Sequence, residues 1–500
     1  MKGLRVIPVS VEPGFEAVVL SPRTARSFGT VAGSRIGVGC RGVLYGAVVF
    51  VDSELEDGVV GLTVGLHEKL GDCETVELYP FELPPSFSAL KKRLEGEPLE
   101  EAEFKKLVSD IVNGFYDEAQ IAGFLVSQLY RQLREDELSY LIRAMVETGV
   151  VVKFPETVYD VHSIGGVPGN SKVALLTVPI VASYGLLIPK TSSRAITSPA
   201  GTADTMEVLA RVTFSPQEVH DIALRVRGAI VWGGALGMAP ADDIFVRVER
   251  KLDIDPKTQM VASILSKKLA MSVSRLVVDI PVGRGAKVED EDEAVALGSV
   301  FLSQAQRLGI NMRVALTYGG EPIGHSVGPA LEAREALETL IRGEGAPSYV
   351  EKACSLAGLV FEIGGAAPRD KGYQLACKIL RSGDAYRRFR EIVEAQDGDP
   401  DVKPEDIKLA SSVFTLEAPR DGVVSMVNNR GISLAARAAG APDDKGAGIF
   451  LHVKTGHRVR RGDPVLTVYA STESKLRDAL RILEETNAVV VEGVVVKVLP

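Results

Sequence analysis

The sequence predicts a multidomain protein that combines α/β and α+β architecture. The chain has 500 residues, more than a single hydrophobic core usually supports, which indicates roughly two to four domains. The spacing of its apolar residues changes from strand-like runs to helical spacing, then to alternating strands and helices, and finally back to strands. We therefore expect a β-rich domain, a helical subdomain, a large mixed α/β domain and a small α+β domain, in that order.

The N-terminal domain is expected over residues 1–85. Here β-branched runs such as LRVIPVSVE and GVLYGAVVFVDS alternate with glycine-rich turns, which is typical of a small β-barrel or sandwich. A proline-rich linker, YPFELPPSF, follows it. The apolar residues of 90–157 have helical spacing and predict a helical subdomain. A later segment, at about 238–272, has the same helical spacing and is expected to belong to this subdomain.

The mixed α/β domain is expected over residues 158–237 and 273–408. Short apolar runs alternate with helical segments there, a pattern that favours a sheet covered by helices. Residues 409–500 return to strand-like runs, with one predicted helix in TESKLRDALRILEET. This last part is expected to form a separate α+β domain.

The charge of the chain argues against nucleic acid or an acidic membrane as its main partner. It carries 57 basic and 66 acidic residues, a formal net charge of −9, and the two signs are mixed along the chain. No apolar run approaches the roughly 20 residues that a membrane-spanning helix needs, and the N-terminus lacks the pattern of a secretory signal. We therefore expect a cytoplasmic protein in which any anion-binding site is a local feature.

The cysteines predict neither a zinc site nor a disulfide framework. Cys40, Cys73, Cys354 and Cys377 lie far apart, and no pair has the CxxC spacing. This pattern fits a reducing cytoplasm.

A first glycine-rich turn, HSIGGVPGN, lies in the α/β region. His162 and Ser163 precede Gly165, Gly166 and Gly169, and a turn with so few Cβ atoms lets several backbone N–H groups point at one oxyanion. Phosphate is the natural ligand for such a turn. The Walker A and GxGxxG patterns are both absent, which argues against an ATPase or a dinucleotide-binding site, and a bare glycine-rich turn without a ligand explains the segment equally well.

A second turn, TSSRAITSPAGTAD, follows within the sequence separation of one βαβ unit. It places several hydroxyl groups around Arg194, whose guanidinium can bind a phosphate or carboxylate with charge-assisted hydrogen bonds. Ordinary helix capping by Thr202 or Asp204 is the alternative. Two such turns on one sheet imply a reaction that consumes phosphate or acts on a phosphorylated substrate. The hydroxyl groups belong to Ser192, Ser193, Thr197, Ser198 and Thr202.

This second turn resembles the signature S-x-R-x-I-x-x-x-x-G-T-x-D-x-x-E of the thymidine and pyrimidine-nucleoside phosphorylase family. Pro199 departs from the family pattern, which usually has Thr or Ala there. VHSIGGV is similar to the family's phosphate loop, and further segments in the expected order extend the resemblance over roughly the last 400 residues. The resemblance implies a class II nucleoside phosphorylase fold and a homodimer, or a higher homo-oligomer, built through the helical domain. The matching residues are Ser192, Arg194, Ile196, Gly201, Thr202, Asp204 and Glu207.

Within the family the chain is most similar to the archaeal AMP phosphorylases. Val161 replaces the Lys that precedes His-Ser in the nucleoside enzymes, the phosphate loop is longer by about two residues, and Val248 stands where those enzymes have a base-reading Arg. The β-rich N-terminal domain also matches this branch. The resemblance implies conversion of AMP and phosphate to adenine and ribose 1,5-bisphosphate, with CMP and UMP as further possible substrates and no metal or organic cofactor.

The resemblance also implies roles for individual residues. Asp255 matches the proposed proton donor to the base, although the DIDP segment is also a good turn and Asp253 is an equal candidate from composition alone. Lys287 follows a predicted strand, a favourable place for a ligand contact. The expected substrate-binding residues are Gly166, Gly169, Ser193, Arg194, Ala195, Ile196, Thr197, Ser198, Thr202, Ser263 and Lys287, with His162, Ser163 and Lys267 as further candidates and no metal ligands.

Two other functions also fit the sequence. A pyrimidine nucleoside phosphorylase, acting on thymidine or uridine, shares the same signature. An inactive nucleotide-binding scaffold protein is the alternative from another class, although the complete set of signature hydroxyl groups argues against it.

Overall fold

The structure is a computed structural model that describes residues 3–11, 13–71, 73–195 and 197–493. The chain forms two compact units. The first unit comprises residues 1–149 and 239–266, and the second comprises residues 150–238 and 267–500. The chain therefore crosses between the units after residues 149, 238 and 266.

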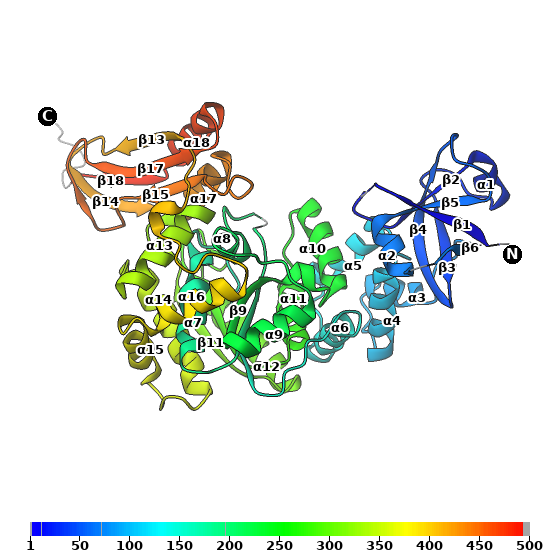
Figure 1. Cartoon of the computed structure of the whole chain (residues 1–500), viewed down its shortest axis with the longest axis horizontal. Helices are drawn as coiled ribbons and strands as arrows, with labels where there is room; N and C mark the ends of the chain where they lie inside the picture. Colours follow the sequence, from blue (N-terminus) through cyan, green and yellow to red (C-terminus); the bar gives the residue numbers. More distant parts are fainter. Residues whose placement is uncertain (1–2, 12, 72, 196, 494–500) are drawn as a thin grey trace. The chain divides into compact units, whose positions relative to one another are not determined.

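The first unit begins with a closed barrel whose strands follow the order β1–β5–β2–β4–β3–β6 (blue in Figure 1). Every second side chain of a strand points inward, so Val18, Val38 and Val60 are fully buried. Closure of the barrel removes the unpaired edges that an open sheet would expose. The elements are β1 (Leu4–Val9), β2 (Ala17–Leu20), α1 (Pro22–Ser27), β3 (Arg35–Cys40), β4 (Val43–Val51), β5 (Val59–Thr63), α2 (Val64–Leu70) and β6 (Thr75–Pro80).

A disulfide joins Cys40 to Cys73 in this barrel, so the prediction that these cysteines stay unpaired is wrong. Cys40 ends β3, Cys73 lies just before β6, and the two strands pair in antiparallel register. The bridge spans 33 residues of sequence and depends on this strand pairing, which cysteine spacing does not reveal. Because two of the four cysteines are paired, the cysteines no longer support the expectation of a reducing compartment. Cys354 and Cys377 are buried free thiols.

Helices form the rest of the first unit. The capping box of Asp117 and Gln120 starts α5, with each side chain accepting from the other residue's backbone N–H at 2.8 and 2.9 Å. Phe124 of α5 packs against Phe245 of α10, with ring centroids 5.7 Å apart, so the segment that follows residue 238 folds with the earlier helices. The helices are α3 (Phe87–Leu94), α4 (Glu101–Val112), α5 (Glu118–Tyr130), α6 (Glu135–Glu147), α10 (Pro240–Leu252) and α11 (Lys257–Ala270), whose last turn belongs to the second unit.

The second unit is built around parallel strands. β7 and β11 pair with β10 on either side, β8 pairs with β9, and a single bridge from Val158 to Leu187 links the two groups. Residues 276–278 of β10 are fully buried, as expected for a parallel strand covered on both faces. The strands are β7 (Val158–Ser163), β8 (Ile188–Ser192), β9 (Gly228–Trp232), β10 (Val273–Val282) and β11 (Asn311–Tyr318).

Helices of the second unit connect and cover these strands. α12 packs on β10 and β11, and α14 packs on β7, β10 and β11. α9 starts with Pro216 in its first turn and a Ser215 side chain that accepts from Glu218 N–H at 3.3 Å, which are typical start signals. The helices are α7 (Val173–Ser183), α8 (Thr202–Met206), α9 (Pro216–Val226), α12 (Glu291–Arg307), α13 (Pro329–Arg342), α14 (Pro347–Ile363), α15 (Gly372–Arg381) and α16 (Asp384–Ala395).

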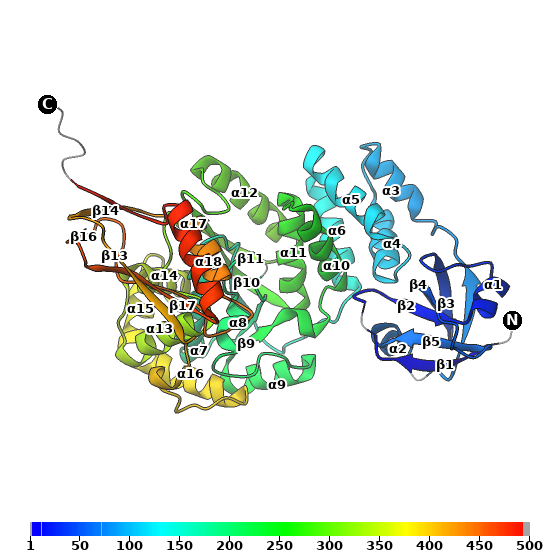
Figure 2. The ribbon, with the colours of Figure 1, turned by 90° about the horizontal axis from the view of Figure 1, so that it is seen from above.

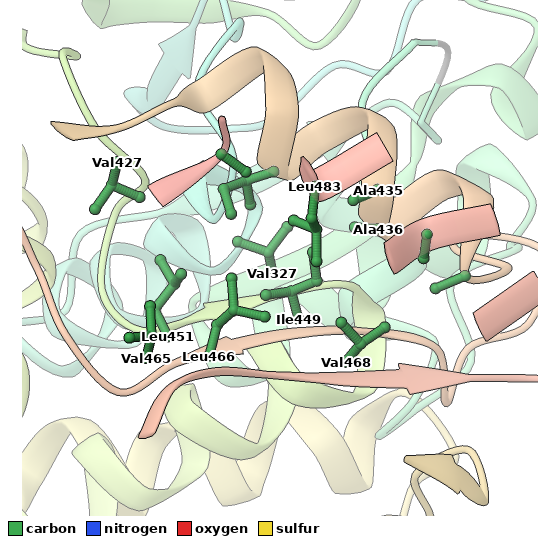
Figure 3. Close-up of a cluster of buried hydrophobic side chains, with 14 of the residues drawn as sticks. Val327, Val427, Ala435, Ala436, Ile449, Leu451, Val465, Leu466, Val468 and Leu483 are labelled. Atoms are coloured by element: carbon green, nitrogen blue, oxygen red, sulfur yellow. The ribbon is translucent and has the colours of Figure 1, made fainter. Parts of the chain in front are cut away.

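Two small antiparallel sheets and two helices end the second unit. Val327, Ile449, Val468 and Leu483 meet in their core (Figure 3). α17 and α18 lie side by side in both views (Figures 1 and 2), whereas the sequence predicted only α18. α17 was missed because its start depends on one side chain, Asn428, which accepts from two backbone N–H groups. The elements are β12 (Ser326–Val327), β13 (Ser412–Glu417), β14 (Gly422–Val427), α17 (Asn429–Ala438), β15 (Gly448–Leu451), β16 (Arg458–Val459), β17 (Pro464–Ala470), α18 (Glu473–Glu485) and β18 (Val489–Glu492).

Candidate active site

Three loops of the second unit follow the ends of parallel strands. β7 ends at Ser163, β8 ends at Ser192 and β10 ends at Val282. Since parallel strands present their carboxyl ends at the same edge of a sheet, these loops share the edge where ligands of open α/β sheets bind. The predicted residues on or beside these loops are His162, Ser163, Gly166, Gly169, Ser193, Arg194, Ala195, Thr197, Ser198, Thr202 and Lys287.

The first loop folds back on Ser163. The Ser163 hydroxyl oxygen accepts from Gly165 N–H at 3.2 Å and from the Asn170 side-chain amide at 2.9 Å. Gly165, Gly166 and Gly169 all have φ between 77° and 89°, the left-handed region that favours glycine. The sequence motif therefore marks real backbone requirements, and the loop is held in one closed turn.

The same loop lies against Lys287 and the segment before β12. A Cβ atom on Gly166 would stand 2.7 Å from the Lys287 backbone nitrogen, and a Cβ on Gly169 would collide with the backbone carbonyl oxygen of Ile323. Both glycines are therefore needed for close approach as well as for their φ angles. Lys287, an exposed residue after β10, thus lies beside the first loop, whereas the sequence predicted only its place after a strand.

His162 stands at the end of β7, next to this loop. Its Nδ1 atom is buried and has no hydrogen-bond partner among the described residues. Burial, together with the positive charges of Lys268, Lys190, Lys267 and Lys287, holds the pKa of the imidazole well below its usual range. The imidazole is therefore neutral at physiological pH.

The second loop is closed by the carboxylate of Asp204. One Asp204 oxygen accepts from Ala195 N–H at 2.7 Å and from Gly201 N–H at 3.0 Å. A Cβ atom on Gly201 would lie 2.6 Å from the Ala195 nitrogen and the Ser193 carbonyl oxygen, so this position excludes any larger residue. The signature residues Gly201 and Asp204 therefore shape the loop itself.

Arg194 pairs with carboxylates of the same signature. Its guanidinium binds Glu207 with two hydrogen bonds, of 2.5 and 2.6 Å, and Asp204 with one of 3.2 Å. Lys445 lies 3.0 Å from each of these carboxylates. The bonds from Arg194 and Lys445 lower the pKa of Glu207 to about 2. In this structure Arg194 thus braces the loop, whereas the sequence suggested a direct contact with an anion.

The two loops touch each other. The Thr202 hydroxyl donates to the Ser171 carbonyl at 3.0 Å, and the Ser171 hydroxyl lies 3.0 Å from that of Thr205. Ser193 and Thr197 are exposed on the second loop, and the Ser198 hydroxyl donates to the Ala200 carbonyl at 3.1 Å. The structure therefore brings the two turns that the sequence singled out into contact. Ile196 lies outside the described residues.

A buried charge cluster lies behind the loops. Lys268 Nζ lies 2.5 Å from the Asp160 carboxylate and 3.3 Å from the Thr191 hydroxyl. Lys190 Nζ lies 3.8 Å from the same carboxylate. Burial, reinforced by Lys268 and opposed by Asp160, lowers the pKa of Lys190 to about 7. No role was predicted for Asp160 or Lys190 from the sequence, because their neighbours come from three separate elements.

A second buried lysine, Lys172, anchors the start of α7. Its Nζ atom donates to the Ile323 and Ser326 carbonyls at 2.6 and 2.9 Å and lies 3.3 Å from Glu335. The Glu332 carboxylate accepts from Lys172 N–H at 3.1 Å. This network fixes the loop end against α13 and was not predicted.

Asp255 and Ser263 belong to the first unit. Asp255 is exposed and lies between α10 and α11, two residues before α11 begins. The Ser263 hydroxyl on α11 donates to Asp242 on α10 at 2.8 Å. Lys267, four residues further along α11, is the first residue of that helix in the second unit. Val248 is buried in α10.

Neither a metal site nor a membrane span is found in the part of the chain that the structure describes. No group of three or more His, Cys, Asp or Glu side chains there could hold a metal ion. None of the helices in that part is long and apolar enough to cross a membrane.

Three family models match the chain in sequence order. Residues 87–149 match the helical bundle domain of the glycosyl transferase family, and residues 155–386 match its a/b domain. Residues 423–489 match the pyrimidine nucleoside phosphorylase C-terminal domain. These matches define the chain as a glycosyl transferase with the domain set of a nucleoside phosphorylase.

Comparison with individual proteins identifies the family more closely. The chain is 71% identical over its full length to the full-length AMP phosphorylase of Hyperthermus butylicus. It is 44% identical to the AMP phosphorylase of Pyrococcus furiosus, with 98% of each chain covered, and 46% identical to AMP phosphorylase 1 of Archaeoglobus fulgidus, with 99% of this chain and 98% of that one covered. The chain belongs to the AMP phosphorylase family.

A solved structure shares the fold. Anthranilate phosphoribosyltransferase from Thermus thermophilus matches with a TM-score of 0.53 and 21% identity, over 62% of this chain and 99% of that one. Together with the family matches, this likeness confirms the predicted fold class of a helical bundle plus a mixed α/β domain.

Proposed function

We propose that this chain catalyses the phosphorolysis of AMP, in which phosphate displaces adenine and ribose 1,5-bisphosphate is formed. The observation that carries the proposal is the 71% identity to an AMP phosphorylase over the whole of both chains. The two adjoining loops at the ends of β7 and β8 support it, because the reaction has to hold two phosphate groups at once. The chain would thus act as a pentosyltransferase in nucleotide salvage or degradation.

The first requirement of the reaction is a held nucleophile. A phosphate oxygen attacks C1′ of the ribose as the bond from C1′ to the base nitrogen breaks, and positive charge grows on the sugar. Holding phosphate and nucleotide together saves up to roughly 7–11 kcal/mol of the barrier. We assign this holding to the first loop with Ser163, Gly166 and Gly169, and to the hydroxyl and backbone groups of the second loop. The proposed residues of that second loop are Ser193, Arg194, Ala195, Ile196, Thr197, Ser198 and Thr202.

Arg194 acts indirectly in this assignment. Because its guanidinium is already bound by Glu207 and Asp204, its role is to fix the loop whose backbone N–H groups meet the anion. Lys287 beside the first loop and Ser263 on α11 are the further proposed nucleotide contacts. His162 and Lys267 are secondary candidates, and the neutral imidazole of His162 suits hydrogen bonding rather than charge compensation.

The second requirement is a proton for the leaving base. Asp255 is the proposed general acid, so its carboxyl proton moves to a purine nitrogen as the bond to C1′ breaks. The proposal requires no metal ion or organic cofactor, because phosphate itself is the nucleophile.

The finer features of the protein are also proposals. CMP and UMP are candidate substrates besides AMP. A homodimer or higher homo-oligomer is proposed from the family resemblance, and a cytoplasmic location is proposed from the charge and apolar patterns of the sequence. The Cys40–Cys73 disulfide is compatible with that location, since intracellular proteins of hyperthermophilic archaea are rich in disulfides.

A pyrimidine nucleoside phosphorylase is the second candidate, favoured by the match of residues 423–489 to that family's C-terminal domain. A panel of AMP, CMP, UMP, adenosine and uridine, each incubated with phosphate and analysed for free base, separates the two. Preferred cleavage of AMP over adenosine and uridine supports the proposal. Preferred cleavage of uridine would replace it with the second candidate, and release of base from none would favour a nucleotide-binding scaffold.

A further inference from the structure

Two buried lysines share one carboxylate beside the candidate phosphate loops. Asp160 on β7, Lys190 on β8 and Lys268 on α11 have only 1%, 6% and 1% of their surface exposed. Lys268 Nζ lies 2.5 Å from one Asp160 oxygen, and Lys190 Nζ lies 3.8 Å from the other. When both lysines are protonated, this cluster has one more positive than negative charge.

A buried positive charge is costly unless an anion compensates it. Lys268 has the closer contact with Asp160 and a second contact, at 3.3 Å, with the Thr191 hydroxyl. The Lys190 ammonium donates to the Thr191 carbonyl at 3.1 Å, and a neutral carbonyl compensates a charge less well than a carboxylate. Lys190 is therefore the member of the cluster that gains most from an additional anion.

The position of Lys190 suits such an anion. It precedes Ser193 by three residues, so it lies just behind the second loop. Its charge acts on the imidazole of His162, which leads into the first loop. A phosphoryl group held by these loops would compensate the excess charge of the cluster.

We propose that Lys190 supplies a proton-dependent positive charge to the phosphate site, so that phosphate binding draws a proton from solvent onto the Lys190 amine. This inference rests on the proposed function in taking the bound anion to be the phosphate of that reaction. Lys190 acts through its charge, as a positioning residue behind the loops. The proton comes from the buffer and adds to the lone pair of Nζ, and no covalent bond to the substrate forms or breaks.

The direction of the pH dependence follows from the groups that face Lys190. Burial, Lys268 and Asp160 together bring its pKa to about 7, so in the free protein the amine is charged below about pH 7 and neutral above it. A bound anion stabilises the charged form and raises this pKa. The His162 imidazole, on which the charge of Lys190 acts, stays neutral in this range because its pKa is held well below the usual value. Phosphate binding therefore requires little proton uptake at low pH and weakens as the pH rises above about 7.

The test is calorimetry of inorganic phosphate binding at about pH 7.5, in buffers of different ionisation enthalpy, with the wild-type chain and Lys190→Arg. Arg stays protonated, and the titration of phosphate itself is common to both proteins. The wild type should take up more protons per bound phosphate than the variant, by up to about three quarters of a proton. Equal uptake would overturn the proposal, and so would failure of the wild type to bind phosphate.

Kinetics give an independent readout. Lys190→Met should raise the KM for phosphate about tenfold or more at pH 6 and much less at about pH 8.5, where the wild-type amine is already neutral. Lys190→Arg should keep the low KM for phosphate at both pH values. The comparison of this variant with the wild type tests the proposal even if Lys190→Met does not fold. A KM in Lys190→Arg that rises with pH as it does in the wild type would contradict the proposal.

The two proposals fail separately. If the wild type takes up excess protons but does not cleave AMP, the proposed role of Lys190 in phosphate binding is retained and the proposed reaction is refuted. Cleavage of AMP with equal proton uptake in wild type and variant would keep the reaction and refute the role of Lys190, which would then belong to an ordinary structural ion pair.

Discussion

Asp255 is the residue on which the chemistry of base release depends. It lies exposed before α11, and Asp253, two residues earlier, provides a matched control. We predict that Asp255→Asn lowers kcat about 100-fold or more and leaves phosphate binding unchanged, because the amide cannot protonate the base. Steady-state kinetics with AMP, together with calorimetry of phosphate binding, measure both effects.

Asp253→Asn should keep most of the activity. Asp253 has a φ of 52°, a backbone conformation that Asn adopts readily, so the substitution leaves the turn intact. If Asp253→Asn loses as much activity as Asp255→Asn, or if both stay within about twofold of the wild type, Asp255 is not the acid.

Glu207 predicts a pH dependence of stability. Hydrogen bonds from Arg194 and Lys445 hold its pKa at about 2, below the ordinary 4.5, so the bonds stabilise the fold above about pH 4.5 and are lost as the pH falls toward 2. Glu207→Gln should therefore lower the Tm most near neutral pH and least at about pH 3. Thermal unfolding at the two pH values tests this, with Glu485→Gln, at an exposed position of α18, as the control.

Single residues were predicted unevenly from the sequence. The glycines of the first loop and the hydroxyl groups of the second stood out, because their conformational and hydrogen-bonding preferences are local properties. The ion pairs of the second loop were only partly visible: Arg194 and Glu207 both lie within the signature, whereas Lys445, which pairs with Asp204 and Glu207, comes from more than 200 residues away. Lys190 and Asp160 carried no local signal at all, since an isolated Lys or Asp in sequence is most often a surface residue.

At the scale of elements, the second loop is defined by how closely its two ends approach. We predict that Gly201→Ala raises the KM for phosphate about tenfold or more, because the added Cβ atom would collide with the Ser193 carbonyl and Ala195 nitrogen at 2.6 Å. Steady-state kinetics with AMP at varied phosphate measures this.

Gly65→Ala is the control for that substitution. A Cβ atom there meets nothing within 4 Å, the residue lies exposed in α2, and alanine favours a helix over glycine by about 0.5–1 kcal/mol. Gly65→Ala should leave the kinetics unchanged. Wild-type kinetics in Gly201→Ala would show that the tight closure of the second loop is not needed for phosphate binding.

The start of α7 depends on a fully buried ammonium group. Lys172→Met should reduce the free energy of unfolding by about 3 kcal/mol or more, because it removes the buried ammonium that pairs with Glu335 and donates to two carbonyl oxygens. Chemical denaturation measures this change. The matched substitution at the exposed Lys475 of α18 should have little effect, and an equal loss in both variants would contradict the assignment.

Elements with a local signal were predicted more reliably than those without one. The helix α18 has clear apolar spacing and was expected, whereas α17 is short and rests on the Asn428 cap. The disulfide between Cys40 and Cys73 was missed because it follows from the pairing of β3 with β6, a tertiary feature.

At the scale of the whole molecule, the order of architectures could be predicted because each part buries its apolar residues with its own period. The return of residues 239–266 to the first unit was suggested by helical spacing. The reaction could not be derived from composition or periodicity. It came from the signature on the second loop, and the identity to AMP phosphorylases along the whole chain supports it.

The dependence of adenine release on phosphate decides whether this chain is a phosphorylase. AMP should yield adenine only when phosphate is present, with one ribose 1,5-bisphosphate formed for each adenine, as followed by chromatography of the base and phosphorus NMR of the sugar phosphate. Adenine release at the same rate without phosphate, with ribose 5-phosphate as the product, would identify a hydrolase instead of a phosphorylase.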